Sequence, residues 1–402
     1  MKIITDVKKI DEILNRGTIV EIFPTKKEFR EKILSGNQMK FYIGFDATAP
    51  TLHLSHAKNF MLMEKFRKLG HEVIILFGDF TARIGDPTGE NSYRRQLSRE
   101  EVLRNIKKWK ELIKPLMSFN DKENPPKIMY NSKWLSKLNF EGLINLASNF
   151  TVQQMIERDM FQKRLKKGQP IYLNEFLYPL MQGYDSVAME IDVEVCGTDQ
   201  IFNALAGRTL LKKLKNKNKY VVAVTLMENP KTGELMSKSK GTGVFLDVLP
   251  SDMFGQIMAQ PDEMVDILFI NNTNFSLDEI KNIIKSSNPV EVKTRLAFEI
   301  VKIYHGEKKA EKAAEEFEKV FRKHEAPGNI EEIAITIKER NIVELLIHLG
   351  LAPSKSQARR LVLENAVKVN GKVINDPMIT ISVSEGMIVQ SGKRNFRKIK
   401  GK

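Results

Sequence analysis

The sequence predicts an α/β fold with a parallel sheet, followed by an all-helical region and a small α+β module. Three observations support this prediction. An apolar strand over Phe41–Phe45 leads through a loop into a helical pattern over Ala57–Leu69 and then into a buried strand over Val73–Phe77, which is the unit of a parallel sheet. From residue 249 to 321 only helix signals recur. Near the end of the chain, Asn370-Gly371 between alternating apolar residues indicates a β-hairpin.

The composition is typical of a folded protein, with 402 residues, 42% of them hydrophobic and 28% charged. The sequence contains no run of about 18 apolar residues that would span a membrane, and the charged residues that follow Met1 argue against a secretory signal. The single cysteine, Cys196, excludes an intrachain disulfide and a zinc site built from cysteines. We therefore expect a cytoplasmic protein without a membrane partner.

Residues 1–40 are expected to be helical, with Thr25 capping one helix. The loop after the Phe41–Phe45 strand lies at the carboxyl end of that strand, where open α/β sheets bind ligands. It delivers His53 and His56, three residues apart. A histidine pair at this spacing also suits metal ligation or helix capping, so the pair alone does not identify a ligand.

The Val73–Phe77 strand ends in a glycine-rich loop that contains Asp86. Its glycines match neither a GxGxxG nor a P-loop pattern, so they support neither dinucleotide nor P-loop chemistry. Because an Asp-Pro pair commonly begins a turn, a structural turn is the simpler interpretation of this loop alone. Residues 98–119 then form a helix that begins at Ser98, and residues 130–168 are mixed helical.

The helix predicted over Asn174–Met189 has an unusual polar stripe. Tyr178, Gln182 and Asp185 are spaced i, i+4 and i+7 and so share one face. A buried phenol, amide and carboxylate each need a partner. The stripe suits a pocket for a small zwitterion with a polar tip, and an exposed polar face is the alternative.

Two later strands also end in polar loops. Ile191–Cys196 ends in Gly197-Thr-Asp199-Gln200, before a helix over Ile201–Leu214. Tyr220–Met227 leads into a loop of small residues around Lys238, which is suited to closing on phosphates. In the all-helical region that follows, helices are expected to start at Pro250, Pro261, Ser276 and Pro289.

The carboxyl-terminal module, residues 341–402, follows a linker predicted over residues 326–340. Ser354 caps a helix that presents Arg359 and Arg360 beside short strands and a basic tail. This combination fits binding to an RNA backbone, and the net charge of +14 agrees with a polyanionic partner. Solvated surface lysines and a disordered basic tail are the alternative.

Several of these motifs together resemble the class I aminoacyl-tRNA synthetases. His53-Leu-Ser-His56 resembles their H-I-G-H signature, and Leu235-Met-Ser-Lys238-Ser239 resembles their K-M-S-K-S loop. The Tyr178 stripe, Gly197-Thr-Asp199-Gln200 and Gly85-Asp86-Pro87 look like the tyrosyl-tRNA synthetase version of the family. The carboxyl-terminal module resembles the ribosomal-protein-type RNA-binding domain, or alpha-L motif, of the bacterial tyrosyl enzymes.

The resemblance implies a Rossmann-like catalytic domain over residues 1–247 and a helical anticodon-region domain over residues 248–325. It also implies a reaction in two steps. L-tyrosine and ATP give tyrosyl-adenylate and pyrophosphate, and the tyrosyl group then passes to the 3′ end of tRNA(Tyr). Mg²⁺ accompanies ATP, and the enzyme is expected to be a homodimer.

The resemblance further implies roles for individual residues, none of which is a ligand of a protein-bound metal. The catalytic residues are expected to be Thr48, His53, His56 and Lys238. The ATP-binding residues are expected to be Gly44, Asp46, His53, His56, Gly197, Asp199, Met236, Ser237, Lys238 and Ser239. The tyrosine-binding residues are expected to be Tyr42, Asp86, Tyr178, Gln182, Asp185 and Gln200. Of the last group, Tyr42 and Asp185 would hold the phenolic hydroxyl.

Two residues depart from the family pattern. Ser55 replaces the signature glycine, and Leu235 replaces the first lysine of the second motif, which removes one cation. Lys231 or Lys240 would have to compensate, and we expect slower adenylate formation than in a relative with both lysines. Two rival interpretations stay open. One is a tryptophan-activating relative, although an indole would not require two groups that read a hydroxyl. The other is an RNA-binding protein on an inactive synthetase fold.

Overall fold

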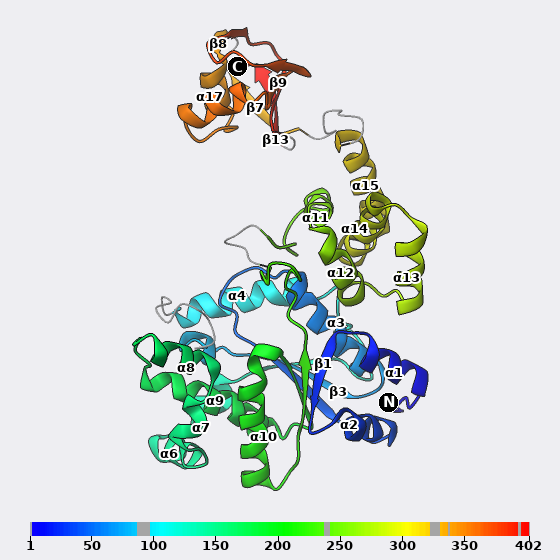
Figure 1. The fold of residues 1–402 in the computed structure, drawn as a ribbon, viewed down its shortest axis with the longest axis vertical. Helices are drawn as coiled ribbons and strands as arrows, with labels where there is room; N and C mark the ends of the chain where they lie inside the picture. The colour runs from blue at the N-terminus through cyan, green and yellow to red at the C-terminus, as the bar shows by residue number, and fades with distance from the viewer. Residues whose placement is uncertain are drawn as a thin grey trace. The chain divides into compact units, whose positions relative to one another are not determined.

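The computed structural model describes residues 2–86, 97–236, 242–321, 330–336, 338–392 and 395–401. The chain divides into two compact units, Met1–Lys309 and Ala310–Lys402 (Figure 1). Helix α15 (Glu307–Phe321) crosses the division. Among the described residues, no helix has both the length and the apolar character needed to cross a membrane.

The first unit is built on a six-stranded sheet with the order β1-β6-β5-β2-β3-β4. Its strands are β1 (Ile19–Phe23), β2 (Lys40–Phe45), β3 (Glu72–Phe77), β4 (Lys127–Tyr130), β5 (Val193–Gly197) and β6 (Tyr220–Val224). All neighbours pair in parallel except β1, which is antiparallel to β6. The carboxyl ends of β2, β3, β5 and β6 therefore meet at one edge of the sheet. The predicted α/β fold with a parallel sheet is confirmed.

Two strands correct the sequence prediction. Residues 1–40 are not helical throughout, because Ile19–Phe23 forms β1. Its burial pattern does not alternate, and a register shift between Ile19 and Glu21 interrupts its pairing, so the period of two that marks a strand is absent. Strand β4 also lies at an edge of the sheet and contains no fully buried residue. Short edge strands of this kind give little signal in a sequence.

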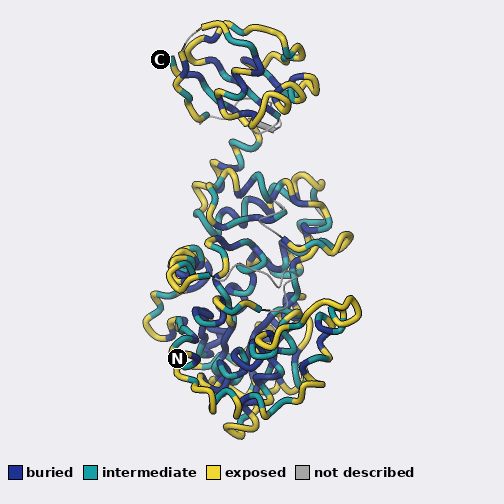
Figure 2. Tube along the Cα trace, turned by 90° about the vertical axis from the view of Figure 1, so that its left-hand side faces the viewer, coloured by how far each residue is buried: buried dark blue, intermediate teal, exposed yellow. Residues whose placement is uncertain are grey.

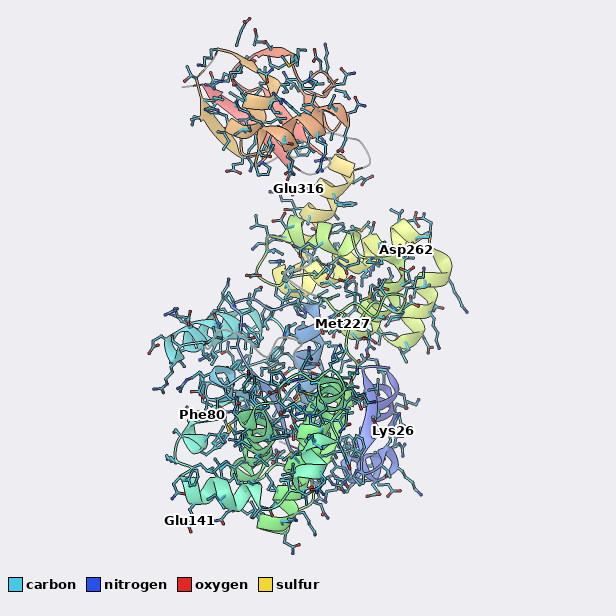
Figure 3. All side chains as sticks on the ribbon, turned by 60° about the vertical axis from the view of Figure 1, so that its left-hand side comes forward. Lys26, Phe80, Glu141, Met227, Asp262 and Glu316 are labelled. Carbon is cyan, nitrogen blue, oxygen red and sulfur yellow. The ribbon has the colours of Figure 1, made fainter. Side chains whose placement is uncertain are left out.

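Helices cover the sheet and supply the walls of its carboxyl edge. They are α1 (Val7–Asn15), α2 (Lys26–Leu34), α3 (Leu54–Lys68), α4 (Arg99–Leu112), α5 (Ser132–Leu135), α6 (Phe140–Ala147), α7 (Val152–Ile156), α8 (Asp159–Lys166), α9 (Leu173–Met189) and α10 (Ile201–Lys215). Helix α3 packs on β2 and β3, whereas α10 packs on β5, β6 and α9. The predicted caps form, since Thr25 accepts from the Glu28 N–H and Ser98 accepts from the Glu101 N–H. Lys26, the first residue of α2, is labelled in Figure 3.

The helical region has the starts that the sequence predicts. It contains α11 (Pro250–Met258), α12 (Val265–Asn272), α13 (Leu277–Ser286) and α14 (Pro289–His305), with a 3-10 turn at Asp262–Met264 before α12. Contacts tie α12 to the first part of the chain. Arg16 donates to the Ile270 carbonyl at 2.7 Å, and Asn272 donates to the Leu54 carbonyl at 2.9 Å. The second bond braces the first residue of α3.

The second unit contains a five-stranded sheet with the order β10-β9-β12-β13-β7 and a two-stranded sheet of β11 and β8. Its elements are β7 (Glu332–Ile335), β8 (Glu339–Asn341), α16 (Ile342–His348), α17 (Lys355–Leu363), β9 (Val367–Val369), β10 (Lys372–Ile374), β11 (Thr380–Ser382), β12 (Ile388–Ser391) and β13 (Asn395–Gly401). The predicted hairpin is confirmed, because β9 and β10 pair antiparallel and Asn370 and Gly371 both have positive φ.

The linker predicted over residues 326–340 is wrong in its second half. Glu332–Ile335 forms β7, which pairs in parallel with the basic tail as β13. The tail is therefore a strand from Asn395 to Gly401, and its Ile399 is buried in the core of this unit. A strand as short as β7 can be predicted only when its pairing partner is known. Figure 2 shows buried residues inside each unit.

Candidate active site

A pocket of about 600 Å³ opens at the carboxyl edge of the parallel sheet. Its walls come from β2 and the loop after it, the start of α3, the loop after β3, helix α9 and the turn after β5. The predicted site residues that line it are Tyr42, Gly44, Asp46, Thr48, His56, Asp86, Tyr178, Gln182, Asp185, Gly197, Asp199 and Gln200. The fold therefore brings together most of the residues that the family resemblance implies.

One end of the pocket contains a buried carboxylate and a buried phenol. Asp185 is 3% exposed and accepts from Trp134 Nε1 at 2.7 Å and from Asn131 Nδ2 at 3.3 Å. Tyr42 is 1% exposed, and its Oη lies 3.3 Å from Ser186 Oγ. Burial raises the pKa of Asp185 well above its usual value, against the effect of its two donors. Both groups can exchange hydrogen bonds with a hydroxyl placed between them.

The polar stripe of α9 faces the pocket rather than solvent. Tyr178 Oη donates to Asp46 Oδ2 at 2.8 Å. Gln182 Nε2 donates to Glu194 Oε1 at 3.0 Å, and Gln182 Oε1 accepts from Asn203 Nδ2 at 3.0 Å. Each polar group thus has a partner on another element, which removes the alternative of an exposed stripe.

Asp46 joins β2 to the loop after β3. It accepts from Thr81 Oγ1 at 2.7 Å as well as from Tyr178. Burial raises its pKa to about 7, although both hydrogen bonds lower it. A Cβ at Gly78 would overlap Asp46 Oδ1, so only glycine leaves room for this carboxylate. Gly78, which directly follows β3, thereby leaves space for a side chain that lines the pocket.

The loops after β3 and β5 are joined across the pocket. Gln200 Nε2 donates to Asp86 Oδ2 at 2.6 Å and to Asp199 Oδ2 at 2.9 Å. Asn203 Nδ2 donates to Gln200 Oε1 at 2.8 Å and so fixes which way the amide points. Asp86 thus lines the pocket and accepts a hydrogen bond across it, which a purely structural turn does not account for.

The two histidines occupy the first turn of α3. His53 is the N-cap residue, and its backbone N–H donates to His56 Nδ1 at 3.4 Å. His56 lines the pocket, whereas His53 is not among the described residues that do so. Burial lowers the pKa of His53 to about 4 and that of His56 well below its usual value, so both are neutral at pH 7. Because Nδ1 of His56 accepts, its proton is on Nε2, which can donate to an oxyanion.

The segment that follows the K-M-S-K-S-like motif (Leu235–Ser239) pairs with the start of the H-I-G-H-like motif (His53–His56). The Leu54 N–H donates to the Val244 carbonyl at 3.0 Å, and the Leu246 N–H donates to the Leu52 carbonyl at 2.9 Å. Leu235 lines the pocket and is 46% exposed. Three expected ATP-binding residues, Ser237, Lys238 and Ser239, lie outside the described residues. Met236 is buried and is not among the described residues that line the pocket.

Lys58 is a pocket residue that the sequence reasoning missed. It lies on α3, is 2% exposed, and its Nζ donates to Asn59 Oδ1 at 2.8 Å. Burial lowers its pKa to about 7, with the charge of Asp199 acting in the opposite direction. Its place two residues after His56 was the available signal. By contrast, Lys231 pairs with Glu263, is exposed, and is not among the described residues that line the pocket.

Other missed residues act as partners of the expected ones. Asn131 and Trp134 follow β4 in a stretch without a recognisable motif, so nothing in the sequence indicated them. The predicted RNA-binding residues Arg359 and Arg360 are exposed on α17 in the second unit. Arg360 Nε lies 3.7 Å from Glu364 Oε1, a loose contact that leaves its side chain accessible.

Comparisons with known proteins identify the family of the chain. A family described as "tRNA synthetases class I (W and Y)" matches residues 34–322, and one described as "Tyrosine–tRNA ligase SYY-like C-terminal domain" matches residues 323–399. The chain is 40% identical to the tyrosine–tRNA ligase of Moorella thermoacetica, over 99% of this chain and 97% of that protein. It is 39% identical to that of Aquifex aeolicus, over 96% and 97%.

Solved structures resemble the fold at lower identity. A C-terminally truncated mitochondrial tyrosyl-tRNA synthetase from Aspergillus nidulans has a TM-score of 0.66 and 22% identity, over 78% of this chain and 94% of that one. A tyrosyl-tRNA synthetase from Archaeoglobus fulgidus, complexed with L-tyrosine, has a TM-score of 0.59 and 17% identity, over 77% and 100%.

Proposed function

The chain belongs to the class I tRNA synthetases for tryptophan and tyrosine, and from this premise we propose that it is a tyrosine–tRNA ligase. It activates L-tyrosine with ATP to tyrosyl-adenylate and transfers the tyrosyl group to tRNA(Tyr). The observation that supports tyrosine over tryptophan is the pair of buried groups, Tyr42 and Asp185, that line one pocket. The same pair also argues against phenylalanine. This amino acid lacks the hydroxyl and would leave Tyr42 and Asp185 without a substrate partner, which is costly for buried polar groups.

The same pocket offers partners for the rest of the amino acid. Tyr178, Gln182 and Asp86 line the pocket beyond the hydroxyl-reading pair and suit the ammonium group. Gln200 links Asp86 to Asp199 and lies toward the end where the nucleotide would bind. Asp199 is the proposed partner of the ATP ribose. Tyrosine would therefore lie with its phenol against α9 and its carboxylate toward the start of α3.

Activation requires no protein base, because the tyrosine carboxylate is already a nucleophile. One of its oxygens bonds to the α-phosphorus of ATP as the bond to the bridging oxygen breaks and pyrophosphate leaves. The protein positions the two substrates and stabilises charge on the phosphates. Thr48, the Nε2–H of His56 and the ammonium of Lys58 line the pocket and can do this. Lys238 is proposed to join them from the second motif.

We include Mg²⁺ as a companion of ATP. Among the described residues, no group of three or more His, Cys, Asp or Glu side chains could hold a metal ion. Mg²⁺ commonly binds through substrate phosphates, water and one or two carboxylates, and this pocket has carboxylates at Asp86 and Asp199. The residues therefore fit a metal that enters with the phosphates, where it would neutralise part of their charge.

The second unit is proposed to hold tRNA through Arg359 and Arg360, together with the basic strand β13 (Asn395–Gly401). Their exposure and the net charge of +14 support this role. A homodimer and a cytoplasmic location belong to the proposal through the family and its part in protein synthesis.

Amino-acid-dependent exchange of labelled pyrophosphate into ATP tests the proposal. Exchange is expected with tyrosine and not with tryptophan or phenylalanine. Exchange with tryptophan alone would instead support the tryptophan-activating alternative. Absence of exchange with any of the three, together with tight RNA binding, would support an inactive RNA-binding protein.

A further inference from the structure

We propose that Lys219 is a positioning residue for tyrosine, acting through Glu194 and Ser186 on Tyr42 and Gln182. The inference rests on the proposed function, because it concerns the two side chains that would recognise the hydroxyl and ammonium ends of the substrate. Lys219 does not line the described pocket and would not touch the substrate itself.

Lys219 and Glu194 form a buried ion pair behind the pocket. Their side chains are 0% and 2% exposed, and Lys219 Nζ donates to Glu194 Oε2. Lys219 Nζ also donates to Ser186 Oγ at 2.9 Å. A lysine and a glutamate this deeply buried are rare without a partner, and here each neutralises the other.

The pair has a direct contact with Gln182 and one through Ser186 with Tyr42. Glu194 Oε1 accepts from Gln182 Nε2 at 3.0 Å, so the carboxylate fixes the direction of this amide. Ser186 Oγ donates its single hydrogen to Glu194 Oε2 at 3.2 Å and accepts from Lys219. The remaining lone pair of Ser186 then accepts from Tyr42 Oη at 3.3 Å.

This order of donors determines what Tyr42 offers the substrate. Because its hydrogen goes to Ser186, its phenolic oxygen presents lone pairs to the pocket and can accept the hydrogen of the substrate hydroxyl. Phenylalanine has no such hydrogen. Lys219 therefore sets, through Ser186, the feature that distinguishes tyrosine from phenylalanine.

The fold makes room for this arrangement. Tyr42 of β2 pairs with Glu194 of β5, and Lys219 directly precedes β6, the next strand in the sheet. A Cβ at Gly207 of α10 would lie 2.7 Å from Lys219 Nζ and 2.9 Å from Ser186 Oγ. Glycine at this position leaves the ammonium and the hydroxyl the space in which they meet.

Lys219→Met in the full-length protein tests the inference, with KM for tyrosine and for ATP measured by pyrophosphate exchange. The expected result is a KM for tyrosine raised about tenfold or more, weaker discrimination against phenylalanine and a KM for ATP within about twofold of wild type. The matched control is Lys217→Met. Lys217 pairs with Asp192 at 2.7 Å where both side chains are partly exposed, so its loss should change neither KM.

Two further variants test whether Lys219 positions the pocket side chains or only neutralises the charge of Glu194. Glu194→Gln with Lys219→Met removes both buried charges and should restore the thermal midpoint, while the KM for tyrosine stays raised. Ser186→Ala keeps the ion pair and should also raise the KM for tyrosine. If the double variant restores both quantities, or if Ser186→Ala leaves the KM for tyrosine unchanged, Lys219 does not position the pocket. Absence of tyrosine-dependent exchange in the wild type would refute the proposed function instead.

Discussion

Each buried polar side chain in the tyrosine end of the pocket is held by a partner from a distant part of the sequence. Asp185 of α9 accepts from Trp134, and Tyr178 of α9 donates to Asp46 after β2. Such pairs hold the recognition groups in place before the substrate arrives, so less ordering is needed on binding. This rigidity favours a substrate with a hydroxyl. When the substrate lacks one, the recognition groups cannot move to replace the missing hydrogen bond.

Leu235→Lys tests the effect of the missing cation in the second motif. A lysine here would add a positive charge at the rim of the pocket, where Leu235 is part of the lining. A charge-assisted bond to a phosphate stabilises the transition state by about 1.5–3 kcal/mol, so the rate of adenylate formation should rise about tenfold or more. The measurement is the single-turnover rate of tyrosyl-adenylate formation, and an unchanged rate would contradict our view of this substitution.

The pH dependence of ATP use tests Lys58. Its pKa is lowered to about 7 by burial, so the side chain is charged below that pH and neutral above it. Because ATP is an anion, kcat/KM for ATP should fall about tenfold as pH rises through 7 to 9. The charge that acts on Lys58 is that of Asp199, and His56, the titratable neighbour on α3, is neutral. Arg16 and Lys65 line a second, small pocket together with Lys58.

Lys58→Arg is the matched control for this profile, since arginine keeps its charge over the whole range. Ionisation of ATP itself affects both proteins equally. The arginine variant should therefore show a flatter decline between pH 7 and 9. Parallel profiles for the two proteins would show that Lys58 does not titrate in this step.

At the scale of elements, helices α9 and α10 approach so closely that their contact depends on glycine. A Cβ at Gly183 would lie 2.9 Å from Leu210 Cδ1 and 3.2 Å from the backbone of Gly207. The same contact brings the polar stripe of α9 against the strands that support it. The crossing therefore couples helix packing to the shape of the tyrosine pocket.

Gly207→Ala should both destabilise the fold and weaken tyrosine binding. The added methyl group collides with Lys219 and Ser186, and overpacking of this kind costs about 1–3 kcal/mol. Gly255→Ala is the matched control, because Gly255 lies within α11 with open space around its Cβ position. Alanine there should stabilise the protein by up to about 1 kcal/mol. Chemical denaturation measures the free energy of unfolding of both variants. Equal values would contradict the tight packing at Gly207.

The sequence predicts elements well where one periodicity or one cap dominates. The strands at Phe41 and Val73, the caps at Thr25 and Ser98 and the Asn370 hairpin all follow from local physics. Strands β1, β4 and β7 escape prediction because each is short and gains its stability from a neighbour far along the chain. The family and the fold predicted from the motifs are confirmed.

Prediction of the site from the sequence is limited in the same way as prediction of the strands. Motifs identify side chains that face the pocket, such as Asp86 and Asp185. They do not identify the supporting side chains, such as Asn131, Glu194 and Lys219, because any polar residue at the right place in the fold can provide that support. The assigned roles of the motif residues stay predictions until they are tested by substitution.

At the scale of the whole molecule, activation and tRNA binding are proposed to lie in different units. Deleting residues 330–402 removes both sheets of the second unit and the helix that presents Arg359 and Arg360. Pyrophosphate exchange should stay within about twofold of the full-length value, since every described residue that lines the pocket belongs to the first unit.

The same deletion should lower kcat/KM for tRNA at least about tenfold, because several phosphate contacts are lost together. Arg359→Glu with Arg360→Glu in the full chain should act in the same direction and show a weaker dependence on salt. Lys27→Glu, an exposed lysine on α2 of the first unit, serves as the charge control. Unchanged charging after the deletion would exclude tRNA binding by this unit.

Charging of tRNA(Tyr) by the full-length protein, with ATP and labelled tyrosine, tests the proposed ligase activity itself. Tyrosine is expected to become esterified to the 3′ end of the tRNA, whereas tryptophan and phenylalanine are not. Charging of tRNA with tryptophan, or binding of tRNA(Tyr) without charging, would contradict a tyrosine-specific ligase.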